Sequence, residues 1–570
     1  MMQWNLEVFF KNTDDLDLFI SNLKEQVSKF NASYNAKLQS LKSSEFLDAI
    51  KEYENIITSL NKIMTYAYLN FAKDTTKGSF LAKYEEICTK LEEEILFFML
   101  EFNEIDDAKQ DEFIEFCKDY SYILSLSKKQ KAHQLSFKEE RILLRTANTG
   151  ANAFSRLFDE NMARLKFHLD GKELSEEEIL SKLSHSDRNV RKNAALSLSV
   201  TLEQNQHLLT YIYNMIKTDL KNDCELRGYE LPESSRHQSN QIEKSSVDAL
   251  IKASENSFDL VSKFYDKKRQ ILGLEKLYDY DRYAPINKDS EFSWGEAKDI
   301  VLKAFGEFSP EFANLAKRAF DENWCDVFPA PNKQSGAFSH SAVSQVHPFV
   351  LLNFTNKRRD VFTVAHELGH SIHQHLSYSV GTLNSDTPLT TAETASVFCE
   401  MLVFEYIKNK TPKNELAGLL AGKLEDIFAT LYRQINFTTF ERLVHAHDGE
   451  ISSDELNQIW MQESKKMFGN SLILNDYYKI WWSYIPHFIH SPFYCYAYSY
   501  AQLLVLALFG LYKSGKCENF VQIYTKFLSL GGSKSPKEMV EMFGFDINQE
   551  EFWQIGISEV KKLVDEFIQI

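Results

Sequence analysis

Glycine and proline are scarce in this sequence, with 20 Gly and 11 Pro in 570 residues. Because these residues are the strongest breaks in local structure, their scarcity leaves long uninterrupted stretches and favours helices over many short strands. Cysteine is also sparse. The seven cysteines are scattered, odd in number and without a C-x-x-C pair, which argues against a disulfide framework and against a cysteine zinc site.

Basic residues are outnumbered, with 64 Lys and Arg against 81 Asp and Glu and a net charge of −17. A phosphate backbone would be repelled on average, so nucleic acid is not expected as a partner. The most apolar stretch, residues 501–511, is shorter than the roughly 20 residues that cross a bilayer. The first residues lack the basic and apolar regions of a signal peptide. We therefore expect a cytoplasmic protein with no membrane partner.

Apolar residues recur at three- and four-residue steps along much of the chain, which predicts successive amphipathic helices from residue 15 to about 205. One such series is Leu47, Ile50, Tyr53, Ile57 and Leu60. A polar loop is predicted over residues 226–239, with helices resuming near residue 245. We expect a mainly α fold with a helical N-terminal region, 1–190, and a second region, 191–570, whose lobes interleave.

One region departs from the helical pattern. Residues 335–343 and 349–354 have the β-branched and aromatic content of two short strands, with Gly, Pro and Ser at their borders. A small sheet is therefore expected just before the segment considered next.

An H-E-x-x-H motif, His366 to His370, lies within a long helical stretch. Histidines four apart project from one face of a helix, so both imidazoles can reach a single metal ion. Glu367, next to the first histidine, can point at a metal-bound water as a general base. The pattern favours a zinc peptidase.

A third ligand is expected at Glu393, which lies 23 positions beyond His370. It falls in the first turns of a helix whose predicted N-cap is Thr390 or Thr391. Zinc held by two histidines and a glutamate keeps one position open for water. We therefore predict one zinc ion (Zn2+) per chain, bound by His366, His370 and Glu393.

Glu400 lies two helical turns after Glu393 on the same face, and two interpretations stay open for it. It can support a ligating histidine from behind, or it can form an ordinary salt bridge. His373 and His375 are not expected to be ligands. Cys399 and Cys495 are expected to be small buried apolar residues rather than nucleophiles.

With these motifs the sequence resembles the oligoendopeptidase F branch of the thimet oligopeptidase family of zinc metallopeptidases. The resemblance covers most of residues 275–500, and the helical N-terminal portion carries no sharp motif. The matching segments are 277–279, 283–285, 333–339, 352–353, 366–370, 392–396, 485–488 and 493–498.

The resemblance implies a two-lobed, nearly all-helical shell around a deep channel that admits short peptides and excludes folded proteins. It implies that His366, His370 and Glu393 bind zinc and that Glu367 is the base. A strand containing Gly336, Ala337, Phe338 and Ser339 would pair with the backbone of the substrate by adding it to a sheet edge.

The resemblance also implies hydrogen-bond donors to the tetrahedral intermediate in the C-terminal part. These are assigned to His487, Tyr494 and Tyr498, and substrate contacts to His490 and Tyr496. Which hydroxyls of residues 494–500 face the metal is left open by the sequence.

The expected function is that of a zinc-dependent endopeptidase that hydrolyses internal bonds of short oligopeptides. A carboxypeptidase or dipeptidyl carboxypeptidase is the nearest alternative, since it uses the same chemistry. A zinc-bearing but inactive peptide-binding scaffold is the alternative from another class, and Glu367 argues against it because a protein that only binds needs no base there. The sequence sets no oligomeric state.

Overall fold

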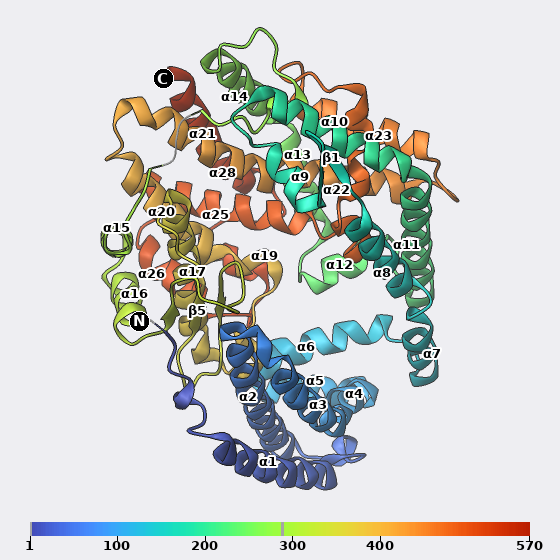
Figure 1. The fold of residues 1–570 in the computed structure, drawn as a ribbon. Helices are drawn as coiled ribbons and strands as arrows, with labels where there is room; N and C mark the ends of the chain where they lie inside the picture. The colour runs from blue at the N-terminus through green and yellow to red at the C-terminus, as the bar shows by residue number, and fades with distance from the viewer. Residues whose placement is uncertain (1–2, 287–289) are drawn as a thin grey trace. The chain divides into compact units, whose positions relative to one another are not determined.

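The computed structural model describes residues 3–286 and 290–570 of the chain. The fold is mainly helical, as predicted (Figure 1). It contains the one small sheet that was predicted and a second, two-stranded sheet that was not. Contacts divide it into two compact units, each assembled from three segments. Unit 1 comprises residues 1–132, 289–409 and 517–543, and unit 2 comprises residues 133–288, 410–516 and 544–570. The sequence predicted a boundary between two regions at residue 190. In the structure that residue lies inside a segment of unit 2 that runs from residue 133 to residue 288.

Unit 1 holds the predicted metal ligands. Its helices are α1 (Thr13–Tyr34), α2 (Ser43–Lys73), α3 (Gly78–Ile95), α4 (Phe97–Glu104), α5 (Asp107–Phe116), α6 (Ser121–Gln130), α15 (Trp294–Phe308), α16 (Pro310–Asp321), α17 (Arg358–Ser377), α18 (Thr382–Ser385), α19 (Leu389–Ala392), α20 (Thr394–Lys408), α26 (Phe520–Ser529) and α27 (Pro536–Glu541).

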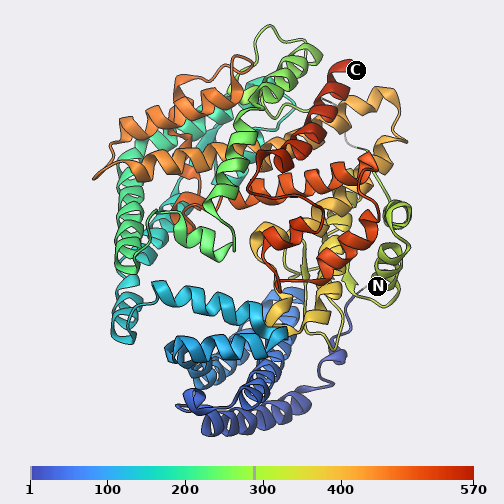
Figure 2. The same cartoon turned by 180° about the vertical axis from the view of Figure 1, so that it is seen from behind.

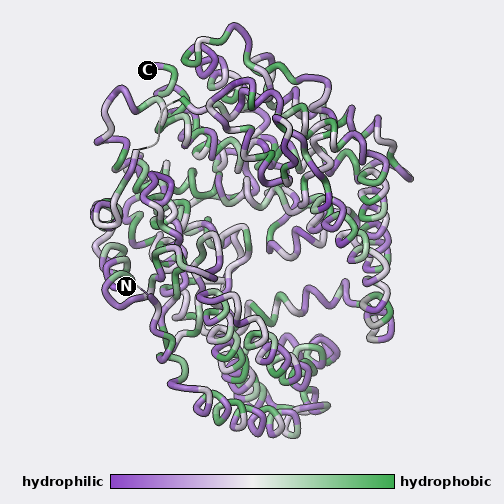
Figure 3. The backbone as a smooth tube through the Cα atoms, viewed as in Figure 1, coloured by the Kyte–Doolittle hydropathy of each residue, from purple (hydrophilic) through white to green (hydrophobic). Residues whose placement is uncertain are grey.

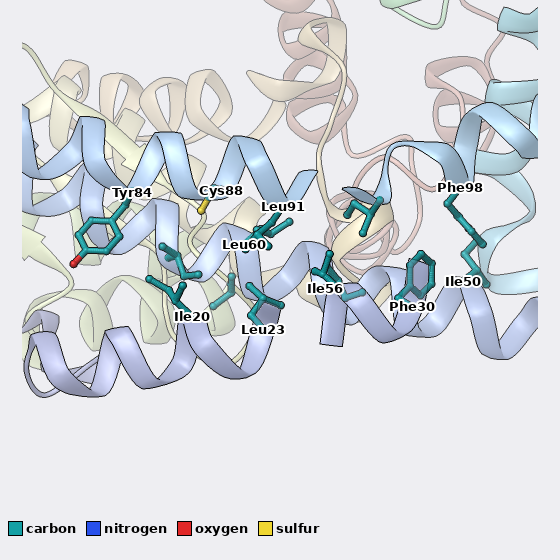
Figure 4. Close-up of a cluster of buried hydrophobic side chains, with 14 of the residues drawn as sticks. Ile20, Leu23, Phe30, Ile50, Ile56, Leu60, Tyr84, Cys88, Leu91 and Phe98 are labelled. Carbon is teal, nitrogen blue, oxygen red and sulfur yellow. The ribbon is translucent and has the colours of Figure 1, made fainter. Parts of the chain in front are cut away.

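The three long helices at the start of unit 1 pack side by side and can be followed in both views (Figures 1 and 2). Their apolar stripes meet in a buried cluster, where Leu23 of α1, Leu60 of α2 and Leu91 of α3 lie together (Figure 4). Leu60 belongs to the series read from the sequence, so its three- and four-residue spacing did identify a core face.

A three-stranded sheet precedes the helix that carries the H-E-x-x-H motif. Its order is β3 (Cys325–Asp326), β5 (Phe349–Leu351) and β4 (Phe338–His340), with β3 parallel and β4 antiparallel to β5. The two strands expected here are present as β4 and β5 but are shorter than predicted. In this order β4 forms an edge of the sheet.

Unit 2 is built around a second buried cluster of apolar residues. Its elements are α7 (Phe137–Ala147), α8 (Ala151–Arg164), β1 (Phe167–Leu169), β2 (Lys172–Leu174), α9 (Glu176–Lys182), α10 (Arg188–Gln204), α11 (Gln206–Arg227), α12 (Ser234–Ser239), α13 (Lys244–Glu255), α14 (Phe258–Ile271), α21 (Lys413–Thr430), α22 (Tyr432–Ala446), α23 (Ser453–Phe468), α24 (His487–His490), α25 (Tyr496–Ser514) and α28 (Glu550–Gln569).

Two local features of unit 2 differ from the sequence reading. The hairpin β1–β2 interrupts a region predicted to be helical throughout, and it turns at Asp170 and Gly171, both with positive φ. An Asp-Gly pair is a strong hairpin signal, so the turn was readable. The loop predicted over residues 226–239 in fact contains the short helix α12.

Hydrophobic and hydrophilic residues alternate along the helices of both units (Figure 3). Among the described residues, no helix is both long enough and apolar enough to span a membrane.

A close backbone contact beside the predicted metal site lies between α17 and α20. A Cβ atom built on Gly369 of α17 would stand 2.6 Å from the Ala395 carbonyl oxygen and 2.6 Å from the Ser396 Cα atom. Only a residue without a side chain allows the helices to approach this closely. Gly369 therefore lets the start of α20 reach the histidines of α17.

Replacing Gly369 with alanine is expected to lower the free energy of unfolding by about 1–3 kcal/mol, because the new methyl group must push two backbones apart. Gly422 lies in the interior of α21 and its Cβ would meet no atom within 4 Å. Gly422→Ala is the matched control and is expected to add about 0.4–1 kcal/mol. Urea unfolding of both variants measures the difference. Equal stabilities for the two variants would show that the close approach is not needed.

Candidate metal centre

Helix α17 presents the two histidines of the motif on one face. The helix begins after Lys357, where the carboxylate of Asp360 accepts hydrogen bonds from the backbone N–H groups of Thr355 at 2.6 Å and Lys357 at 3.1 Å. A carboxylate in the first turn also complements the helix dipole. This cap holds the N-terminal end of the helix in place about two turns before His366.

Glu393 reaches the site from the start of the next long helix. It is itself the N-cap residue of α20, while the short helix α19 precedes it and begins after Pro388. The prediction of Thr390 or Thr391 as the cap was wrong, because the chain makes this separate short turn before α20 starts. The side chain of Glu393 is held by Ser396, whose hydroxyl donates to its Oε2 atom at 2.6 Å.

The structure brings His366, His370 and Glu393 together, with one ligand atom from each lying within 4.8 Å of the others. The Oε2 atom of Glu393 is 3.3 Å from Nε2 of His366 and 3.3 Å from Nε2 of His370. Tetrahedral ligands about 2.0–2.1 Å from a zinc ion stand roughly 3.3–3.4 Å from one another. The donor set and its spacing therefore fit zinc.

The carboxylate of Glu400 lies behind the first histidine, with its Oε2 atom 3.4 Å from Nδ1 of His366. This leaves Nε2 directed at the shared site, as expected of an outer partner that selects the tautomer. Burial alone would lower the pKa of His366, but Glu393 and Glu400 raise it to about 10. Burial would raise the pKa of Glu393, and the two imidazoles lower it. The site therefore stabilises positive charge.

Glu367 is buried, at 7 % exposure, and lines the same cavity as the three ligand side chains. Burial raises the pKa of its carboxyl group. The cavity, called here the metal-site cavity, has a volume of about 500 Å³, and β4, α17 and residues 385–387 form its walls. A carboxylate beside a metal site in such a cavity has the place that a general base needs.

The outer edge of β4 is partly occupied by side chains. Val350 donates its N–H to Trp324 on the β3 side, so the backbone groups of its partner Ser339 face away from β5. The Ser339 carbonyl accepts a hydrogen bond from Nε2 of Gln374 at 3.1 Å, and its hydroxyl donates to Oε1 of Gln374 at 2.7 Å. Two residues further along the chain, the Ser341 carbonyl accepts a hydrogen bond from the hydroxyl of Tyr378.

These bonds leave a short free section of the edge. The Gly336 carbonyl accepts from Nδ2 of Asn353 at 2.8 Å, and Gly336 has φ +81°, a conformation that favours glycine. Strand alternation directs the backbone of Ala337 outward beside the metal-site cavity, which it lines together with Phe338. Among the described residues, no side chain bonds to the backbone of Ala337, which lies just before β4.

His487, Tyr494 and Tyr498 gather on unit 2. Nε2 of His487 lies 3.3 Å from the Tyr498 hydroxyl, and the rings of Tyr494 and Tyr498 are 5.1 Å apart. His487 and Tyr494 are half-buried, and Tyr498 is exposed. The guanidinium of Arg236 lies 5.6 Å from the Tyr494 ring.

The other two residues of this stretch differ from each other. Tyr496 is fully buried, and its hydroxyl is bonded to Nδ1 of His237 and Nδ2 of Asn240, both at 2.9 Å. Its side chain is therefore not open to a substrate in this structure. His490 is exposed and pairs with Asp159 at 2.8 Å.

A buried carboxyl group fixes the backbone just before Tyr494. Phe493 has φ +58° and donates its N–H to Oε1 of Glu441 at 2.8 Å. Glu441 is fully buried, and burial raises its pKa to about 8. A non-glycine residue in this conformation needs such support.

His373 and His375 lie outside the three-residue metal group. Burial lowers the pKa of His373 to about 4, and His375 packs against Trp324 with ring centroids 5.7 Å apart. Cys399 and Cys495 are buried and unpaired.

Sequence reasoning missed two residues that shape the site. Ser396 lies three positions after Glu393, which is the spacing of one helical turn, and Gln374 lies four positions after His370 on the same helix face. Both spacings were visible in the sequence. The strand that Gln374 contacts was predicted, but its contact with Gln374 was not.

Comparison with known families matches most of the chain. The model of peptidase family M3 matches residues 181–559, and a second model, described as oligopeptidase F, matches residues 101–167.

Curated relatives extend over nearly the full length. The chain is 27% identical to an oligoendopeptidase F homologue of Borreliella burgdorferi over 98% of both chains. It is 27% identical to oligopeptidase PepF of Bacillus subtilis over 100% of this chain and 87% of that protein.

Solved structures show the same fold. A crystallised chain from Chlamydophila abortus has a TM-score of 0.90 at 23% identity and covers 100% of this chain and 98% of its own. Oligoendopeptidase F from Enterococcus faecium has a TM-score of 0.72 at 21% identity and covers 98% and 99%. At these identities the likeness concerns the fold alone.

Proposed function

The chain belongs to peptidase family M3, in its oligoendopeptidase F branch, and from this premise we propose that it is a zinc-dependent endopeptidase of short oligopeptides. Its action on oligopeptides as a metallopeptidase follows from the family. The observation that supports the finer proposal is the convergence of His366, His370 and Glu393 beside the buried carboxyl group of Glu367.

The three convergent side chains would hold the zinc ion. When bound, zinc supplies Lewis acidity toward a carbonyl oxygen and toward water. Glu400 and Ser396 keep His366 and Glu393 oriented toward that position, which reduces the reorganisation needed when the ion binds.

Glu367 moves the proton. In the proposed reaction it takes a proton from the attacking water and passes it to the amide nitrogen of the substrate. The C–N bond then breaks, and a carboxylate and an amine leave. Burial suits this task, because the raised pKa of Glu367 makes its carboxylate a stronger base than an exposed glutamate.

The remaining assignments are proposals supported by the family resemblance. His487, Tyr494 and Tyr498 are proposed as donors to the oxyanion, which is the electrostatic part of catalysis. Ala337 is proposed to pair with the substrate backbone at the free section of the β4 edge. A cytoplasmic location is also proposed, and the seven unpaired cysteines agree with a reducing compartment.

The test is hydrolysis of a quenched fluorescent peptide of about nine residues with both ends blocked. We expect cleavage at an internal bond, complete loss of cleavage after treatment with a chelator, and recovery when zinc is restored. Mass spectrometry of the products identifies the bond.

Blocked ends separate the alternatives. A carboxypeptidase or dipeptidyl carboxypeptidase would leave the blocked peptide intact but trim the free acid from its C-terminus. A binding scaffold would hydrolyse neither peptide while holding one zinc ion per chain. Either outcome would contradict the proposal.

A further inference from the structure

A second cavity adjoins the metal-site cavity within unit 1. Its volume is about 400 Å³, and its walls come from α2, α3, residues 340–344 and residues 378–386. The two cavities share Ser341, Ser385 and Asp386. A peptide held at the metal site can therefore extend one end into this second space.

Backbone pairing does not continue in that direction. The outward carbonyls of Ser339 and Ser341 already accept hydrogen bonds from Gln374 and Tyr378, and Tyr378 lines the second cavity. The sheet edge thus offers a peptide few acceptors beyond Ala337. Recognition in the second cavity must rely on side chains or on the end of the peptide.

The charged groups that line the second cavity are all acidic. They are Glu85 of α3 and Asp386, and neither lysine nor arginine is among the lining residues. The histidine of this wall, His340, is neutral near pH 7 because burial lowers its pKa to about 4. We call this space the acidic cavity.

Asp386 is exposed, as is Glu85, and it lacks a partner within the part of the chain that the structure describes. The described residues provide its carboxylate with no hydrogen bond and no cation. Although the side chain is exposed, the protein around this concave wall raises its pKa by desolvation. An unpaired carboxylate in the wall of a cavity gains from an incoming positive charge, and its exposure to water keeps that gain modest.

The loop that carries Asp386 is held in place. Nδ2 of the buried Asn384 donates to the Asp119 carbonyl at 2.9 Å, and the N–H of Gly532 donates to the Asn384 carbonyl at 2.7 Å. A Cβ atom on Gly532 would stand 2.0 Å from the Asp386 carbonyl oxygen. The backbone that carries the carboxylate is thus positioned before any ligand arrives, which lowers the entropic cost of binding.

We propose that the acidic cavity is a substrate subsite that binds a cationic nitrogen of the peptide, with Asp386 and Glu85 as its charged contacts. The nitrogen belongs to a lysine or arginine side chain or to a free amino terminus. This inference rests on the proposed function, since it deepens the substrate class of the same site.

Binding is measured in the Glu367→Gln background, so that hydrolysis does not consume the probe. The probes are fluorescein-labelled octapeptides of one neutral sequence, in which lysine, norleucine or glutamate is placed in turn at each position. A second set compares free with acetylated amino termini. Fluorescence anisotropy gives the dissociation constants.

At one position we expect the lysine peptide to bind about 5- to 10-fold more tightly than the norleucine peptide, and the glutamate peptide more weakly than both. If the amino terminus is the ligand, the peptide with a free amino terminus instead binds more tightly than its acetylated counterpart. The preference should shrink when the ionic strength is raised from about 0.05 to about 0.5 M.

Asp386→Asn is expected to reduce the lysine-to-norleucine ratio to about 1–2, with Glu85→Gln giving a smaller reduction. The matched control is Asp48→Asn, which removes the same charge from the exposed face of α2, thirteen residues or about 20 Å of helix before Asn61. Asp48→Asn should leave the lysine-to-norleucine binding ratio unchanged. Thermal unfolding checks that all variants fold.

Equal binding of the lysine, norleucine and glutamate peptides at every position, with no effect of acetylation, would overturn the subsite. A lysine-to-norleucine binding ratio that stays unchanged in both Asp386→Asn and Glu85→Gln would also overturn it. Failure of the proposed function is a different result, because it would appear as intact peptide in the zinc-loaded unmutated protein whatever the binding preference.

Discussion

Glu367→Gln is expected to lower kcat by about 100- to 10 000-fold while leaving one zinc ion bound per chain. Glutamine has nearly the size of glutamate and suits the same buried position, so the helix and the ligands should stay in place. It cannot accept a proton from water at neutral pH. Turnover of the blocked peptide and zinc content by mass spectrometry are measured on the same preparation.

Two readouts make this result specific to the base. Asp48→Asn provides a control for loss of a carboxylate elsewhere in unit 1, and it should retain full turnover. Near-normal turnover of Glu367→Gln would contradict the assignment, whereas loss of zinc together with turnover would show that Glu367 supports the ligands instead.

His370→Ala is expected to abolish both zinc binding and hydrolysis. The site then keeps one imidazole and one carboxylate, and two ligands hold zinc far more weakly than three. The loss in affinity should exceed the roughly 10- to 100-fold that removal of an outer hydrogen-bonding partner costs. Competition with a chelator of known affinity measures it, and circular dichroism confirms that the helices persist.

Variants on the neighbouring side chains should form a graded series. Glu400→Gln, which weakens the support of His366, is expected to reduce zinc affinity by about 10- to 100-fold. His375→Gln removes a histidine of the same helix that lies outside the metal group, and it should bind zinc normally. Retention of full zinc by His370→Ala, or loss of zinc by His375→Gln, would contradict the ligand set.

The part of the site that lies on one helix could be predicted from the sequence on physical grounds. Helical periodicity alone places His366 and His370 on one face and Glu367 beside them. Glu393 is different, because its approach depends on the contact of Gly369 with the backbone of Ala395 and Ser396. Spacing carries no information about that contact. Glu393 was chosen as a carboxylate in the first turns of the next helix, and the family resemblance implied the same residue.

The error at the start of α20 has a similar origin. Threonine is a good N-cap, so Thr390 and Thr391 were reasonable candidates from local preference. In the structure both side chains are buried, and Glu393 takes the cap position, where Ser396 binds its carboxylate. Tertiary packing overrode the local preference.

Short elements were the least predictable part of the fold. Helix α12 has six residues, and its position agrees with the bond between His237 and the buried Tyr496 rather than with any periodic pattern. Gln374 and Asp386 were missed for the same reason, since their importance comes from β4 and from the acidic cavity. Such partners belong to segments distant in sequence.

The discontinuous build of unit 1 has a consequence for the order of synthesis. The Tyr524 hydroxyl of α26 donates to the Thr394 carbonyl at 2.8 Å, one residue after Glu393, and α26 also packs on α17. A nascent chain exposes its N-terminal segments first. The ribosome must therefore add more than a hundred residues after Glu393 before this hydrogen bond can form, so the start of α20 is synthesised long before the helix that supports it.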